Sequence, residues 1–487
     1  MNRPEGLDAV VVGSGPNGLA AAIVLAAAGL RVRLYEEGST LGGGCRTAEL
    51  TLPGYAHDVC SAVHPLAEAS PFFQRFGLEA RSVRLLHPDV AFAQPLDGGQ
   101  AAVAFNDLER TADELGADGR PYRRLFAPLV EHAPDLAGAV LSSLREVPDG
   151  ASHLVSFAVA GMRSVEAIVR RFEGARARAL LGGVAAHAMR PLDAPLTGGI
   201  ALFLASLAHG VGWPLVEGGS ERIVDAMADD LKARGVEVAT SSPVRSLAEL
   251  PPSRAVLLDV SPLALASIAK SRLPERYLRG LRRFRYGPGT CKVDWALDGP
   301  VPWQAEACRK AGTLHLGGTF EELASAEAEV AAGRHPEKPY VLAVQPGVVD
   351  RSRAPDGKAT LWTYCHVPAG SDVDMSEAVA SQIERFAPGF RDLVLERAVR
   401  TAKGTEEENP NCVGGDIACG AQSLRQTLFR PVARWSPHRL PLRGVYLCSS
   451  ATPPGPGVHG RCGELAARSA LEDLFGIEKV EIGPAAP

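Results

Sequence analysis

An apolar stretch, a glycine-rich turn and a second apolar stretch open the chain. Residues 8–12 form a short run that is apolar enough for a buried strand, and residues 19–28 are alanine-rich and favour a helix. Gly29 is expected to end that helix, and residues 31–35 then predict a second strand. The order strand, helix, strand predicts a βαβ unit with parallel strands.

The turn in this unit carries the spacing GxGxxG through Gly13, Gly15 and Gly18. The first glycine allows the tight turn, the second lets the backbone approach a pyrophosphate, and the third lets the helix lie close to the sheet. Pro16 and Asn17 begin the helix, whose N-terminal N–H groups favour phosphate. The turn therefore predicts a dinucleotide site, and the alternative is a glycine-rich turn in an ordinary βαβ unit.

An acidic pair, Glu36 and Glu37, follows the second predicted strand. A carboxylate at Glu36 can accept hydrogen bonds from both ribose hydroxyls and would repel a 2′-phosphate, which argues against NADP.

A second glycine-rich turn comes directly after the acidic pair, where a nicotinamide dehydrogenase would usually begin a helix. Its predicted cofactor-binding residues are Gly42, Gly43, Gly44, Arg46 and Thr47. These residues suit a ligand that continues past the pyrophosphate, as FAD does. In this region the chain resembles the flavoprotein superfamily of amine oxidases and phytoene desaturases, although Gly38 stands where that superfamily often has arginine.

Cys45 raises a different possibility, that of a dithiol reductase. Such enzymes need a second cysteine about five residues further on, so that two thiols can exchange electrons with the flavin. Position 50 is Leu50 and the next cysteine is Cys60, so we reject this mechanism.

Two distant segments are expected to return to the N-terminal unit. The first has a helix over 220–233 and a strand over 236–240, followed by Val244 in a second short strand. The second has a strand over 444–449, a turn over 453–460 and a helix over 461–474. The resemblance implies contacts with the adenine end and with the flavin, from Val244 in the first case and from Gly455, Gly457 and Val458 in the second.

The resemblance extends over nearly the whole chain, and several phrases, such as "YLCSSATPPGPGVHG", are most similar to the phytoene dehydrogenase-like branch. It implies an α/β fold: a Rossmann-like FAD-binding domain of the glutathione-reductase and amine-oxidase type, with a discontinuous α+β substrate domain. The FAD-binding domain is predicted over 1–69, 213–289 and 421–487, and the substrate domain over 70–212 and 290–420.

Three residues are candidates for catalysis. Lys292 lies on a predicted strand over 292–297, where it is either an exposed lysine on an edge strand or, by resemblance to flavin amine oxidases, the residue that holds a water at flavin N5. His459 lies inside the predicted flavin turn. Asn411, with its neighbours Asn409 and Asp416, can either face the substrate or form a turn.

An apolar helix is predicted over 198–209, either as a core helix or as one wall of an apolar substrate tunnel, and it is too short to span a bilayer. His209 at its end is expected to be a core histidine. The histidines show no metal-ligand spacing, so no metal site is predicted.

Composition narrows the choice of partners and compartment. The net charge of −5 comes from interspersed charges, and no basic stripe indicates nucleic acid. The nine cysteines have no CxxC pair, and the first strand leaves no room for a signal peptide, so we expect a cytoplasmic protein; peripheral contact with a membrane stays open. Oligomeric state is left undetermined.

The expected function is two-electron oxidation by FAD. A hydride passes from a C–H bond of a small, apolar molecule to flavin N5, forming C=C or C=N, and O₂ or a quinone reoxidises the flavin. Three alternatives stay open: a flavin amine oxidase, a non-catalytic protein that uses flavin for stability and binds a partner, and an NAD dehydrogenase.

Overall fold

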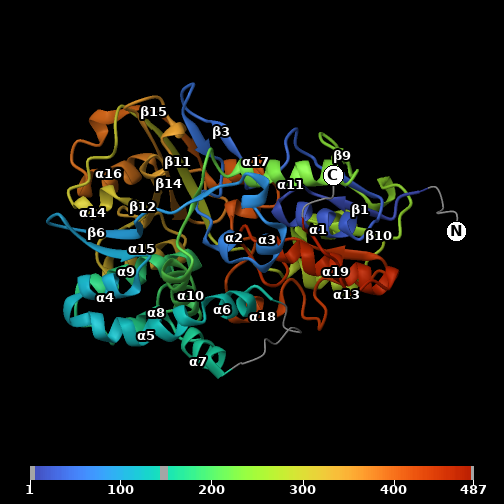
Figure 1. Cartoon of the computed structure of the whole chain (residues 1–487), viewed down its shortest axis with the longest axis horizontal. Helices are drawn as coiled ribbons and strands as arrows, with labels where there is room; N and C mark the ends of the chain where they lie inside the picture. Colours follow the sequence, from blue (N-terminus) through green and yellow to red (C-terminus); the bar gives the residue numbers. More distant parts are fainter. Residues whose placement is uncertain (1–5, 143–151, 484–487) are drawn as a thin grey trace.

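A computed structural model describes residues 6–142 and 152–483. The ends of the predicted FAD-binding domain (1–5 and 484–487) and residues 143–151 of the predicted substrate domain lie outside this description. Two large sheets, of five and seven strands, organise the described part of the chain. Figure 1 shows them toward opposite ends of the long axis, with helices α4, α5 and α10 on one side of the larger sheet.

The five-stranded sheet is parallel and has the strand order β16-β10-β1-β2-β9. Its strands run over Ala9–Val12 (β1), Val32–Tyr35 (β2), Glu237–Ala239 (β9), Ala255–Leu258 (β10) and Val445–Leu447 (β16). Helices cover both faces, which explains why β1 and β10 are apolar without alternation. The βαβ unit, the returning strand near residue 237 and the C-terminal strand are confirmed, with ends that differ by at most three residues.

Three helices pack on one face of this sheet: α1 (Pro16–Ala27), α11 (Glu221–Ala233) and α19 (Arg461–Phe475). Small residues allow the close contact between α1 and α19. A Cβ at Gly463 would lie 1.8 Å from the carbonyl oxygen of Asn17, so only glycine permits this approach. The opposite face carries α12 (Pro262–Ile268) and α13 (Glu275–Arg282).

The predicted second short strand at Val244 is wrong. Ser241 has a positive φ of 50°, which turns the chain out of the sheet after β9. The backbone N–H groups of Ser241 and Ser242 then donate to the carbonyls of Gly38 and Glu36. Val244 therefore lies in a loop, held against the segment that follows β2.

The seven-stranded sheet has the order β15-β11-β14-β13-β12-β6-β7 and is antiparallel except between β12 and β6. Its strands run over Val90–Leu96 (β6), Gln100–Phe105 (β7), Gly289–Leu297 (β11), Ala311–Leu316 (β12), Val341–Val344 (β13), Ala359–Val367 (β14) and Val394–Arg400 (β15). One face packs on α16 (Ser376–Phe386), and the other turns its Leu342, Trp362 and Tyr364 toward a layer of helices. This alternation is the period of two expected of a strand.

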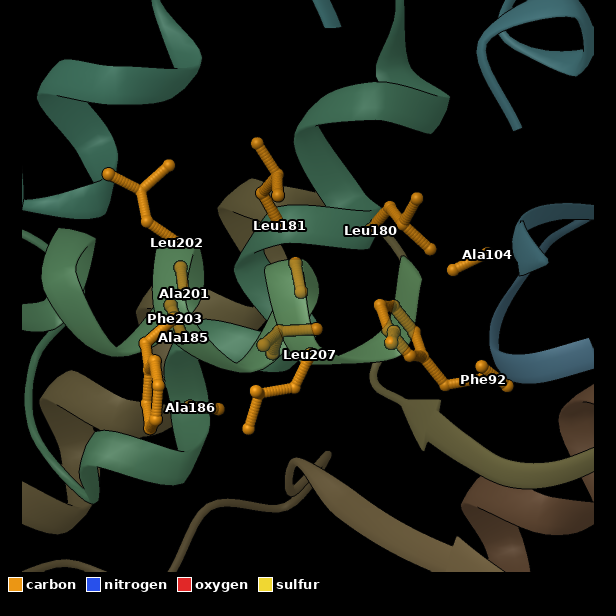
Figure 2. Close-up of a cluster of buried hydrophobic side chains, with 14 of the residues drawn as sticks. Phe92, Ala104, Leu180, Leu181, Ala185, Ala186, Ala201, Leu202, Phe203 and Leu207 are labelled. Atoms are coloured by element: carbon orange, nitrogen blue, oxygen red, sulfur yellow. The ribbon is translucent and has the colours of Figure 1, made fainter. Parts of the chain in front are cut away.

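The helical layer centres on α5 (Gly119–Glu131), α9 (Ala175–Ala185) and α10 (Thr197–Gly210). Figure 2 shows leucines of α9 and α10 in one cluster, with Phe92 of β6 at its side. The apolar helix predicted over 198–209 is thus confirmed as α10. Its His209 is a core histidine as expected, since its ring bonds to the Tyr122 hydroxyl and the Phe105 carbonyl.

The remaining elements connect these layers. The helices are α2 (Pro65–Ala69), α3 (Pro71–Phe76), α4 (Leu108–Glu114), α6 (Ala133–Val140), α7 (Ser152–Gly161), α8 (Val165–Val169), α14 (Glu306–Arg309), α15 (Phe320–Ala331), α17 (Ala402–Glu408) and α18 (Leu424–Phe429). Two further sheets are antiparallel pairs of short strands: β3 (Thr47–Glu49) with β4 (Ala56–Asp58), and β5 (Leu85–Leu86) with β8 (Leu215–Val216).

The two large sheets draw their strands from different parts of the chain. Strands of the five-stranded sheet fall within 1–69, 213–289 and 421–487, and those of the other sheet lie in the remaining segments except that β11 begins at residue 289. The boundaries of the two domains stay a prediction. Within the described residues, no helix combines the length and the apolar character needed to cross a membrane.

Candidate active site

One cavity of about 1260 Å³ extends from the glycine loop of β1–α1 to the helical layer. Most of the predicted cofactor-binding residues line it. They are Gly13, Gly15, Pro16, Asn17, Glu36, Glu37, Gly43, Gly44, Arg46, Val244, Gly457 and Val458. Segments that are hundreds of residues apart in the sequence therefore meet around one space.

Four predicted cofactor residues do not line this cavity. Gly18 packs behind the loop, where a Cβ would lie 2.0 Å from the Gly13 carbonyl oxygen. Gly42 donates its N–H to the Ser14 carbonyl, and a Cβ at Gly455 would meet the Arg430 guanidinium. Thr47 hydrogen-bonds to Asp58 and to the N–H of Glu221. These residues shape the loops rather than the inner surface.

Glu36 holds the glycine loop to the end of β2. Its Oε2 accepts hydrogen bonds from the N–H and the hydroxyl of Ser14, at 2.9 and 2.6 Å, and its Oε1 accepts one from the N–H of Gly38. The carboxylate still borders the cavity, where it can accept further bonds from a ribose.

Asp259 is a site residue that our sequence analysis missed. It follows β10, lines the cavity, and its Oδ2 accepts a hydrogen bond from the N–H of Gly18 at 2.9 Å. Burial raises the pKa of this carboxyl to about 7, against the hydrogen bond from Gly18, and the nearby Glu36 adds to the rise. Its place at the carboxyl end of a central parallel strand was the available signal.

The second glycine turn reaches across to the C-terminal half through Arg46. The guanidinium donates to the Gly43 carbonyl at 2.8 Å and pairs with Glu408 of α17 at 2.5 Å. One side of the turn thus lines the cavity, and the ion pair of Arg46 connects the turn with α17.

Lys292 is buried, so its interpretation as an exposed lysine on an edge strand is wrong. Strand β11 lies between β15 and β14, and the ammonium pairs with the buried Asp294 two residues along the strand. Burial lowers the pKa of Lys292, and the Asp294 carboxylate opposes that shift.

The surroundings of Lys292 connect it with the main cavity. Its Nζ lies 5.6 Å from the centre of the Trp362 ring, and it faces a smaller cavity that shares Gly44, Trp362 and Tyr364 with the larger one. The structure therefore brings Lys292 near the second glycine turn, and its role at flavin N5 stays a prediction.

His459 is placed differently from our expectation, because it does not line the main cavity. Its ring is buried: Nδ1 accepts from the N–H of Arg461 and Nε2 donates to the Gly455 carbonyl. Burial lowers the pKa of His459 to about 4, which keeps the ring neutral. Both ring nitrogens form hydrogen bonds within the turn before α19, so neither is free to contact a substrate.

Asn411 lines the cavity, but its Oδ1 accepts the N–H of Ser261 at 2.6 Å. Its neighbour Asp416 is buried and accepts three backbone N–H groups, from Gly287, Ala418 and Gly420. The turn-forming alternative therefore holds for Asp416, while Asn411 keeps only its amide NH₂ for the cavity.

The far end of the cavity is apolar. Ile200, Phe203 and Leu204 of α10 face it, whereas Ala201, Leu202 and Ala205 of the same helix pack into the core. One side of this helix is therefore core and another is cavity wall, and a substrate in that cavity stays a prediction. Trp213, Leu141 and Phe157 continue the apolar surface.

Within the described residues the cysteines form no disulfide. All nine are free thiols, and Cys45 is buried with its Sγ directed at the Ser220 carbonyl. Burial raises the pKa of Cys45, which disfavours the reactive thiolate. A dithiol mechanism at this position therefore has no support in the geometry.

The loops fit a dinucleotide. A Cβ at Gly43 would lie 3.2 Å from the Cα of Gly15, and a Cβ at Gly15 would lie 2.8 Å from the Asp259 carboxylate. Bare backbone therefore forms this end of the cavity. In the first turn of α1, Pro16 has no N–H and the N–H of Gly18 is bonded to Asp259, which leaves the N–H of Asn17 without a helical partner. Backbone N–H groups at a helix N-terminus are suited to a pyrophosphate.

Comparison with known proteins agrees with this geometry. The NAD(P)-binding Rossmann-like domain matches residues 11–76. Pyridine nucleotide-disulfide oxidoreductase domain-containing protein 2 of Mus musculus is 27% identical over 97% of this chain and 94% of its own length. Phytoene desaturase of Cercospora nicotianae is 26% identical over 74% of this chain and 61% of its own.

Among solved structures, putrescine oxidase bound to putrescine has a TM-score of 0.57 at 17% identity, covering 96% of this chain and 98% of that one. That likeness shows the fold. The chain is similar to the first of these relatives over nearly its whole length, its N-terminal part matches a Rossmann-like domain, and it shares its fold with putrescine oxidase.

Proposed function

We propose that the protein binds FAD and oxidises a C–H bond of a small, mainly apolar molecule, forming C=C or C=N. One observation carries this proposal: a single cavity joins the dinucleotide loops to an apolar chamber. A ligand in the loops and a second molecule in the chamber would therefore be in contact.

The choice of FAD over NAD rests on the length of the cofactor end. Glu36 borders it on one side, Gly43 lies in the middle, and Gly457 and Val458 border it from the C-terminal turn. If the protein were an NAD dehydrogenase, the position of that C-terminal turn beside the cavity would have no explanation. Bound FAD supplies the hydride acceptor, and the chain supplies position, dryness and charge.

The protein's own part begins with Glu36 and the glycine turns, which would hold the ribose and the pyrophosphate. The apolar side chains of α10, with Trp213, exclude water from the chamber, which strengthens electrostatic interactions there. Substrate binding would depend mainly on burial of apolar surface.

Lys292 is the candidate for the oxidative half of the cycle. Asp294 holds its ammonium in a buried position beside Trp362. A fixed cation in a dry site stabilises negative charge that develops on O₂ as it takes up electrons. We propose O₂ or a quinone as the electron acceptor, and Lys292 favours O₂.

Amine oxidation is the second candidate. The rings of Trp362 and Tyr364 lie 5.3 Å apart at 77°, next to Lys292, and both line the main cavity. Aromatic rings that flank the flavin face, together with Lys292 at flavin N5, would favour amine oxidation. An open surface above the flavin, with no enclosed cavity, would instead favour the alternative of a non-catalytic protein.

The visible spectrum of the purified protein tests the proposal. We expect a yellow protein that bleaches with dithionite and recovers in air. Lys292→Met should keep the colour and slow recovery by at least about tenfold, since a charge-assisted interaction is worth roughly 1.5–3 kcal/mol. Lys270→Met, which removes an exposed lysine, is the matched control. A protein that stays colourless with added FAD would refute the cofactor.

A further inference from the structure

The face of the seven-stranded sheet that borders the cavity carries a row of three side chains. Thr313 of β12 is opposite Val344 of β13, which in turn is opposite Trp362 of β14. Residues that are directly opposite in neighbouring strands project to the same face. Thr313 and Trp362 both line the main cavity, so the row forms part of its floor.

Two polar atoms in this row have no hydrogen-bond partner within the part of the chain that the structure describes: Thr313 Oγ1 and Trp362 Nε1. The two residues are only 0% and 4% exposed. Buried polar groups nearly always have a partner, because leaving one unpaired is costly. Two unpaired donors on one cavity wall therefore point to a ligand that completes them.

The chemistry of that ligand follows from the donors and from the groups around them. An indole N–H can only donate, and a hydroxyl can donate or accept, so an acceptor atom satisfies both. His187, which lines the same cavity, bonds to the buried His315 through their Nε2 atoms at 3.0 Å. Burial lowers the pKa of His187 to about 3, so this pair adds no positive charge that would favour an anion.

We propose that the substrate is an apolar molecule with a neutral hydrogen-bond acceptor, a carbonyl or hydroxyl oxygen, and that Thr313 and Trp362 donate to it. They would determine specificity by rejecting a pure hydrocarbon of the same shape, since the hydrocarbon would leave both donors unpaired. This inference rests on the proposed function, because it identifies the class of its substrate.

A pair of probes with nearly the same shape tests the proposal by binding alone. 2-Acetylnaphthalene carries a carbonyl where 2-isopropenylnaphthalene carries a methylene group. Isothermal titration calorimetry on the purified holoprotein should show that the ketone binds about five to ten times more tightly, the usual effect of one hydrogen bond. Thr313→Val, which keeps the shape of the side chain, should remove most of this preference and leave the binding of the hydrocarbon within about twofold. Trp362→Phe should also remove most of the preference.

Thr360→Val is the matched control. Thr360 lies on the same strand as Trp362, is 3% exposed and also has an unpaired hydroxyl, but it does not line the cavity. Both threonine variants should raise the melting temperature, because each removes an unpaired buried hydroxyl, and only Thr313→Val should change the preference between the probes.

Three results would overturn the inference: equal binding of the two probes by the wild-type protein, no binding of either probe at millimolar concentration, or a melting temperature that falls in Thr313→Val. The last would mean that water already satisfies the hydroxyl. None of these measurements needs turnover. A protein that holds FAD but binds both probes equally would refute only the role of Thr313 and Trp362 as donors to the substrate. A protein that holds no FAD would refute the proposed function.

Discussion

Replacing Asp259 by asparagine should change how the stability of the protein depends on pH. The carboxyl accepts the N–H of Gly18 and lies against the glycine loop. Burial raises its pKa from an ordinary value of 3.8 to about 7. Asparagine keeps an oxygen for Gly18 and has nearly the same shape, so the substitution removes only the charge.

The sign and size of the effect follow from this raised pKa. Ionisation is harder in the folded protein than in the unfolded chain, so the free energy of unfolding of the wild type falls as pH rises from about 4 to about 7 and then stays level. A shift of about three pKa units corresponds to ~4 kcal/mol at most. Asp259 is only half-buried because it borders the cavity, so solvent screening should reduce the effect to about 2 kcal/mol.

Urea unfolding between pH 4.5 and 8.5 measures this directly. The advantage of Asp259→Asn over the wild type should be smallest at the acid end and grow to about 2 kcal/mol above pH 7. FAD affinity should also improve at high pH, since a negative charge beside the predicted pyrophosphate site is removed. Asp229→Asn, at an exposed position on α11, is the control. A difference that is the same at every pH, or that favours the wild type at high pH, would refute the reasoning.

Three further substitutions test the frame of the site. Gly18→Ala places a Cβ 2.0 Å from a backbone oxygen, so it should lower the free energy of unfolding by roughly 1–3 kcal/mol and release FAD. The control is Gly138→Ala, in open space on α6, which should leave stability unchanged. Equal melting temperatures of the two variants would contradict this reasoning. Glu36→Gln should weaken FAD binding about tenfold in equilibrium dialysis, and unchanged affinity would exclude the ribose contact. Arg353→Met leaves the buried Asp58 unpaired and should cost about 3–5 kcal/mol in urea unfolding, which a second change, Asp58→Asn, should partly restore.

The cofactor end of the molecule could be predicted well from the sequence. Gly13, Gly15 and Glu36 stand at spacings that follow from local geometry, because a strand, a tight turn and a helix need those residues within a short stretch. Twelve of the sixteen predicted cofactor residues line the main cavity. The helices and strands around them agree with prediction to within a few residues at most ends.

Local pattern was a poorer guide to the catalytic candidates. His459 was chosen for its place in the turn, but the fold uses both its ring nitrogens to hold the start of α19. Lys292 could equally have been exposed until the pairing of β11 with two neighbours buried it.

Thus the sequence by itself determined the dinucleotide loop, the order of its βαβ unit and the apolar helix α10, since each depends on residues that are close together in the chain. Only the tertiary structure decided that Asp259 lies against the glycine loop and that Thr313 and Trp362 share one cavity floor. These positions depend on which strands pair and in which register. That choice is made by the burial of whole sheet faces, and no short stretch of sequence carries it.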